Sequence, residues 1–103
     1  MRIDDDARLY LRWEAVTNVP TDDATITLKV GDALHALAWS GAAVQSGQSW
    51  TRTAQSSAMF TGSNVTPQGS DVALEPGQYR CEAILTLPDG QIVPARPFTL
   101  TVA

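Results

Sequence analysis

The stretch that most constrains the fold runs from residue 74 to residue 102 and contains two runs of alternating apolar and polar residues. The dipeptide Asp89-Gly90 separates the runs and predicts a type I′ hairpin turn, because both residue types accept positive φ. A period of two is typical of a β-strand with one face against a core. The residues of that face are Tyr79, Cys81, Ala83, Leu85 and Leu87 before the turn, and Phe98, Leu100 and Val102 after it.

Length and composition indicate one all-β domain. The chain has 103 residues, of which 44% are apolar and 17% charged, so it can bury a core of its own. Thr, Val, Ser, Gly and Pro are plentiful and Lys occurs once, which favours strands and turns over helices. We expect residues 1–7 to form a solvated leader and residues 8–103 to form the single domain.

Two earlier segments also alternate as strands do. In residues 8–16 the predicted inner face contains Leu9, Leu11, Trp13 and Ala15, and the outer face contains Arg8, Tyr10, Arg12 and Glu14. Residues 24–30 form a second predicted strand, which Gly31-Asp32 would end in a two-residue type II′ turn. That turn sets a register in which His35 lies beside Leu28, Leu37 lies beside Ile26, and Trp39 follows on the same face.

The middle of the chain has a weaker pattern. Residues 40–49 are rich in Gly, Ser and Ala and predict a loop, whereas residues 50–54, 58–61 and 71–74 predict short strands. In the last run Pro94 and Pro97 each lack a backbone N–H donor. Because the two prolines are an odd number of residues apart, the missing donors would lie on opposite sides of a regular strand. We therefore expect a bulge or a strand switch near Ala95-Arg96, and an edge position for the last strand.

The motif Leu74-x-Pro76-Gly77-x-Tyr79-x-Cys81 resembles the start of the sixth strand of immunoglobulin-like sandwiches, where a Tyr two residues before a cysteine bonds back to the preceding corner. The resemblance implies a two-layer antiparallel immunoglobulin-like β-sandwich of about seven strands, with Trp39 as the counterpart of the core Trp. The structural turn and corner residues are then Pro76, Gly77, Tyr79, Asp89 and Gly90. The expected core includes Trp13, Ile26, Leu28, Tyr79, Leu85, Phe98 and Leu100.

Three motifs together are similar to small immunoglobulin-like domains of tailed-bacteriophage virions, such as capsid decoration, neck and baseplate proteins. They are Pro76-Gly77-x-Tyr79, Leu87-Pro88-Asp89-Gly90 and Pro97-Phe98-x-Leu100-x-Val102. This resemblance covers the last third of the chain. It implies a virion component that is assembled in the cytoplasm of a bacterial host.

Few residues offer chemistry. His35 has no second His or Cys pair beside it, and Cys81 is the only cysteine, so we expect no catalytic residue, no metal site, no cofactor and no internal disulfide. A net charge of −4 with scattered cations argues against nucleic acid as a partner. The acidic run Asp4-Asp5-Asp6 lacks the ligand spacing of a calcium loop. The N-terminus has no signal-peptide pattern, and no apolar run is long enough to span a membrane.

The sequence leaves two functions open besides the less favoured possibility of an enzyme. The first is a non-enzymatic structural module that docks on protein partners in a larger assembly, with Tyr10, Arg12 and Trp50 as the candidate interface, because aromatic residues and Arg are enriched in interface cores. The second is a carbohydrate- or ligand-binding module of a bacterial protein, in which exposed Trp39 or Trp50 stacks on sugar rings. Two coplanar indoles facing solvent would favour the second function.

Overall fold

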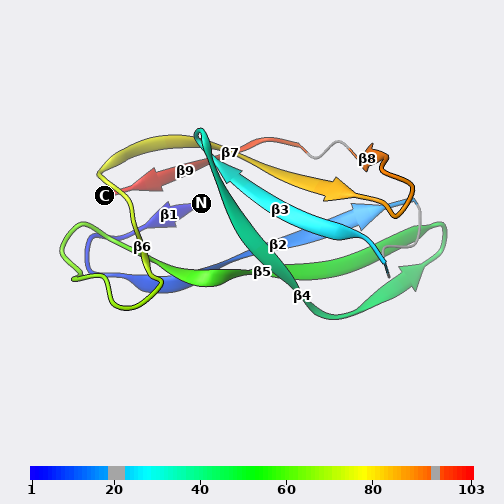
Figure 1. Ribbon diagram of the computed structural model, residues 1–103, viewed down its shortest axis with the longest axis horizontal. Helices are drawn as coiled ribbons and strands as arrows, with labels where there is room; N and C mark the ends of the chain where they lie inside the picture. Colours follow the sequence, from blue (N-terminus) through cyan, green and yellow to red (C-terminus); the bar gives the residue numbers. More distant parts are fainter. Residues whose placement is uncertain (19–22, 94–95) are drawn as a thin grey trace.

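The computed structural model describes residues 1–18, 23–93 and 96–103, and that part of the chain is all-β without a helix. Figure 1 shows β7 and β9 on the upper side and β5 on the lower side, with β3 and β4 crossing between them. The strands are β1 (Arg2–Ile3), β2 (Arg8–Thr17), β3 (Thr25–Val30), β4 (Ala33–Ser46), β5 (Ser49–Thr61), β6 (Val72–Ala73), β7 (Gly77–Thr86), β8 (Ile92–Val93) and β9 (Phe98–Val102).

The strands form one curled, mixed sheet that resembles half of a barrel. Its order is β1-β9-β7-β3-β4-β5-β2, with β6 added to β5 and β8 added to β7. The all-β class is confirmed, but the sheet is not purely antiparallel, because β1 runs parallel to β9 and β6 runs parallel to β5. Strand β4 joins the two halves, since residues 33–36 pair with β3 and residues from Leu37 onward pair with β5.

Buried apolar side chains line the concave side of this sheet in two clusters. Of the predicted core residues, Ile26, Leu28, Leu85 and Leu100 are buried. Trp13, Tyr79 and Phe98 are half-buried and pack against the clusters. The first cluster contains Ile3, Leu11, Leu28, Val30, Phe60, Cys81, Leu100 and Val102, and the second contains Ala24, Ile26, Ala54, Ala83 and Leu85.

The β3–β4 turn agrees with the sequence, and β4 pairs with β3 as far as Ala36. Gly31 has φ of +57° and no described non-glycine residue has positive φ, which fits type II′ and excludes type I′. His35 lies opposite Leu28 as predicted. The β3–β4 ladder ends at Thr27 and Ala36. Leu37 and Trp39 still pack against the cluster that contains Ile26, in agreement with the predicted face, while Leu37 also lies opposite Ser56 of β5.

The predicted loop at residues 40–49 is also wrong. Strand β4 continues to Ser46, and only Gly47-Gln48 separates it from β5, which is one strand rather than two short ones. The β4–β5 ladder is irregular between Ser40 and Val44, where extra residues of β4 form a bulge. Small residues carry no periodic signal, yet their backbones pair because β5 lies beside them.

The turn after β7 differs from the predicted type I′ turn. Gly90 N–H donates to Leu87 O at 2.9 Å and Leu87 N–H donates to Gln91 O at 2.8 Å, which makes a three-residue loop of Pro88, Asp89 and Gly90. Only Gly90 of this loop has positive φ, at +88°. The arrangement is that of a type I turn followed by a glycine bulge. Pro88 explains the difference, because its fixed φ suits the first central position of a type I turn.

An irregularity separates β8 from β9, as the two prolines predict. Val93 pairs with Leu85 and Phe98 pairs with Cys81, so five residue steps on one side match four on the other. This is one extra residue, as in a bulge. Pro94 and Ala95 lie outside the described residues, and so does the part of the prediction that concerns them.

The N-terminal segment belongs to the sheet, which corrects two expectations. Arg2 and Ile3 pair with Thr101 and Val102, and Ile3 is fully buried, so residues 1–7 are not a leader outside the domain. For the same reason β9 lies between β7 and β1 rather than at the sheet edge. The acidic residues that follow, Asp4 to Asp6, are exposed as predicted. A single buried Ile between charged residues is too short a pattern to indicate a strand.

Candidate functional site

The outer side of β2 carries the most prominent group of exposed side chains with binding chemistry. Because side chains alternate along a strand, burial of Leu11 and Ala15 on the concave side directs their neighbours outward. Tyr10 is 43% exposed and Val16 is 63% exposed. We call the four outward side chains the outer β2 surface: Tyr10, Arg12, Glu14 and Val16.

Neighbouring strands extend this surface. Tyr10 lies opposite Met59, and Arg12 lies opposite Gln55, to whose Oε1 it donates a hydrogen bond from Nε at 3.2 Å. Val16 lies opposite Thr51, which in turn faces the exposed Val44 on β4. The surface therefore combines an aromatic ring, a guanidinium group and aliphatic side chains, a composition that suits contact with another protein.

Trp50, the third candidate interface residue, does not join Tyr10 and Arg12. It lies opposite Thr17, and its side of β5 is the side of the fully buried Ala54. Residues of β5 that are an even number apart here share a face, so Trp50 is on the concave side and is half-buried. The structure brings two of the three candidates together and separates the third by the thickness of the sheet.

Trp39 is held by contacts within the protein. Its indole N–H donates to Ala24 O at 2.8 Å, and the guanidinium carbon of Arg52 lies 4.6 Å from the centre of a Trp39 ring. Arg52 Nε also donates to Gly41 O at 2.9 Å, so the cation is fixed over the indole. The sequence did not predict this pair, because Trp39 and Arg52 lie on different strands and no local pattern joins them.

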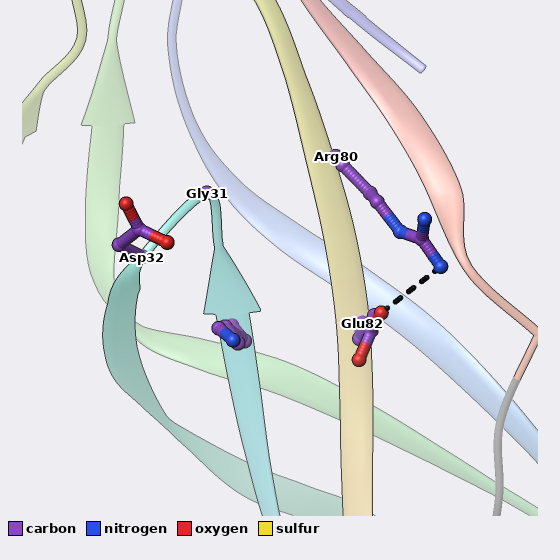
Figure 2. A pocket seen from close by; sticks show the side chains of 5 residues that line it. Gly31, Asp32, Arg80 and Glu82 are labelled. Carbon is purple, nitrogen blue, oxygen red and sulfur yellow. Dashed lines mark ion pairs between the residues drawn. The ribbon is translucent and has the colours of Figure 1, made fainter.

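A shallow hollow lies on the convex side of β3 and β7, the side away from the core (Figure 2). Figure 2 shows Arg80 reaching toward Glu82, with 3.3 Å between Nη2 and Oε1, while Asp32 stands apart on the turn. Lys29 lies opposite Glu82 across the strand pair. Each carboxylate or cation on the two strands therefore has an opposite charge beside it. Because the hollow is open and its charges balance, it offers no concentrated field for a charged ligand.

The two groups with potential nucleophilic or acid–base chemistry are placed as packing residues. The His35 ring meets Phe60 edge-to-face at 5.1 Å, and burial lowers the pKa of His35. His35 Nε2 has no hydrogen-bond partner among the described residues. Cys81 is fully buried, and burial raises the pKa of its thiol, which disfavours the reactive thiolate. In the described ranges, no three His, Cys, Asp or Glu side chains gather as a metal site would require.

The predicted corner residues lie at both ends of β7. Pro76 and Gly77 precede or begin the strand, and the Tyr79 hydroxyl donates a hydrogen bond to Glu75 O at 2.7 Å. This is the hydroxyl-to-backbone contact that the sequence predicted. Asp89 and Gly90 form the turn beyond the other end, where Asp89 Oδ1 accepts from Gln91 N–H at 3.0 Å. These five residues shape the strand and do not form a site.

Comparison of the chain with protein-family models, with curated proteins and with solved structures finds no match. Within the described part of the chain, no helix has the length and apolar character needed to cross a membrane.

Proposed function

We propose that this protein is a non-enzymatic structural module that binds other proteins in a larger assembly, with the outer β2 surface as its contact. The observation that carries the proposal is the exposure of Tyr10 and Arg12 side by side on a ten-residue strand whose other face is anchored in the core. Contacts through such residues cost little ordering entropy, because the strand is already held by β5.

We further propose that the all-β fold is, more specifically, an immunoglobulin-like sandwich. Such sandwiches place the strands B, E and D in one sheet and C, F and G in the other. The pairing of β2 with β5 and of β5 with β4 supports the first group, and the pairing of β7 with both β3 and β9 supports the second. The Tyr79–Glu75 hydrogen bond matches the tyrosine corner of that fold. Trp39 departs from the pattern, because it lies on β4 rather than on the strand corresponding to C.

In its most specific form the proposal is a component of a tailed-bacteriophage virion, assembled in the cytoplasm of a bacterial host. The support for this form is the resemblance of the motifs around Tyr79, Asp89 and Phe98. Those motifs do not identify the part of the particle to which the protein binds. Mass spectrometry of any particle that binds the protein would identify it.

The test uses a tagged chain produced in the organism that encodes it and sedimented through a sucrose gradient. We expect the protein in the fractions of a large particle and the double variant Tyr10→Ala/Arg12→Ala in the light fractions. A matched control, Leu34→Ala/Arg80→Ala, removes two exposed side chains of β4 and β7 and should sediment like the unchanged protein. The proposal fails if the unchanged protein stays light or if both double variants behave alike.

The carbohydrate-binding alternative receives no support from the tryptophans. It requires indoles that face solvent, whereas Trp39 donates its N–H to Ala24 and carries Arg52 over its ring, and Trp50 is half-buried on the concave side. Binding of the pure domain to an oligosaccharide array, with loss on Trp50→Ala, would nevertheless replace the assembly proposal.

A further inference from the structure

Strand β2 has one side without a partner in the described part of the chain. It pairs with β5 along Arg8–Thr17, and it is the last strand in the sheet order. The strand that precedes it, β1, lies along β9 instead. Within residues 1–18, 23–93 and 96–103, no strand pairs with the other side of β2. Such an edge is a template for pairing with another strand.

The backbone groups on this edge can be assigned to particular residues. Leu11 N–H donates to Ser56 Oγ on β5 at 3.0 Å, so Leu11 directs its backbone groups toward β5. Successive residues of a strand direct their backbone groups to opposite sides. The residues that face the open edge are consequently those of the outer β2 surface: Tyr10, Arg12, Glu14 and Val16.

We propose that the partner of this edge is the β2 strand of a second copy, paired antiparallel about a two-fold axis at Trp13. In that register Arg12 of each copy lies directly opposite Glu14 of the other. The pairing is isologous, so one register creates two opposite-charge pairs. Both residues are exposed, and directly opposed opposite charges on neighbouring strands stabilise the pairing.

The neighbouring registers are disfavoured by charge. The backbone phase allows only shifts that move each residue by two positions relative to its partner. A shift in one direction places Arg12 opposite Arg12, and a shift in the other places Glu14 opposite Glu14. Like charges in direct opposition destabilise a strand pair. The alternation of Arg12 and Glu14 thus disfavours both neighbouring registers.

The same register covers apolar surface that the single chain leaves open. It places Tyr10 of one copy opposite Val16 of the other, and these side chains are 43% and 63% exposed in one chain. On the concave side it brings together the two half-buried Trp13 indoles. An aromatic–β-branched pair and an aromatic–aromatic pair are among the stabilising cross-strand combinations. The dimer would carry one continuous sheet and a doubled outer β2 surface.

The test is sedimentation equilibrium of the purified protein up to millimolar concentration. We expect a monomer–dimer equilibrium whose dissociation constant rises about tenfold or more in Arg12→Glu and in Glu14→Arg, because each change creates two pairs of like charges that face each other directly. The combined variant Arg12→Glu/Glu14→Arg should restore the dissociation constant to within about threefold, because it restores both opposite-charge pairs.

The control is Arg80→Glu, which makes the same charge change on the convex side of β7 and should leave the dimer unchanged. A protein that stays monomeric at every concentration overturns the inference, and the charges of β2 then serve to block edge pairing. A dimer that the combined variant does not restore also overturns it. The measurement needs no assembly partner, so its failure is separate from failure of the proposed function.

Discussion

The Tyr79 hydroxyl lies 2.7 Å from Glu75 O, four residues earlier in the chain, and ties the turn at Pro76-Gly77 to the start of β7. Tyr79→Phe should lower the free energy of unfolding by about 0.5–1.5 kcal/mol without changing the fold, because one hydrogen bond is lost and the ring keeps its packing. Urea denaturation measures the change. Tyr10→Phe is the matched control and should change stability by less than about 0.5 kcal/mol. An unchanged stability of Tyr79→Phe would mean that water replaces the bond at no cost.

Leu85 is 1% exposed and lies in the second core cluster. Leu85→Ala should cost about 2–5 kcal/mol, because the packed surroundings of the side chain cannot fully close the cavity. Thermal unfolding followed by circular dichroism would show the loss. Leu34→Ala removes the same side-chain atoms at a position that is 64% exposed, and it should cost less than about 0.5 kcal/mol. Similar costs at both positions would contradict the assignment of the core.

Gly62 touches the N-terminal turn so closely that a side chain has no room. A Cβ atom there would overlap the carbonyl oxygen of Asp4 and would lie 2.7 Å from the carbonyl carbon of Asp5. Both obstacles are backbone atoms and cannot rotate away. Gly62→Ala should therefore destabilise the protein by at least about 1–3 kcal/mol, the range for overpacking. Ser57→Ala, at an exposed position of β5, is the control for urea unfolding, and equal stability of the two variants would refute the close contact.

Arg8 and Asp71 form a bidentate ion pair, in which Arg8 Nε lies 2.7 Å from Asp71 Oδ2 and Arg8 Nη2 lies 3.1 Å from Asp71 Oδ1. The Arg8 hydrogen bond lowers the pKa of Asp71, and Gln68 N–H adds to the effect. A carboxylate with a pKa that is lower in the folded state stabilises the fold above its unfolded pKa. This contribution is lost as the pH falls through the folded pKa.

The acid sensitivity of the protein should therefore depend on Asp71. Between about pH 5 and about pH 2 the stability of the unchanged protein should fall more steeply than that of Asp71→Asn, which cannot titrate. Urea midpoints across this range measure the difference. Asp89→Asn, at the exposed turn, should retain the steep fall. Parallel pH profiles for the unchanged protein and Asp71→Asn would rule out the contribution of this pair.

The sequence by itself determined what depends on neighbours along the chain. Alternation placed Leu11 on the concave side and Tyr10 on the convex side of β2, because successive side chains of a strand point to opposite faces. Gly31 predicted the tight turn before β4 through its freedom to adopt positive φ. The position of Tyr79 after Pro76-Gly77 predicted its hydrogen bond to the corner. Each of these contacts spans few residues.

Only the tertiary structure decided which strands meet and which face a given residue shares with a distant one. It extended β4 along β5, buried Ile3 beside β9, placed Arg52 over Trp39, and put Trp50 on the opposite face from Tyr10. The physical reason is that a period of two orients side chains within a strand but carries no information on its pairing partner. That partner is selected by the summed packing and hydrogen bonding of segments far apart in the chain.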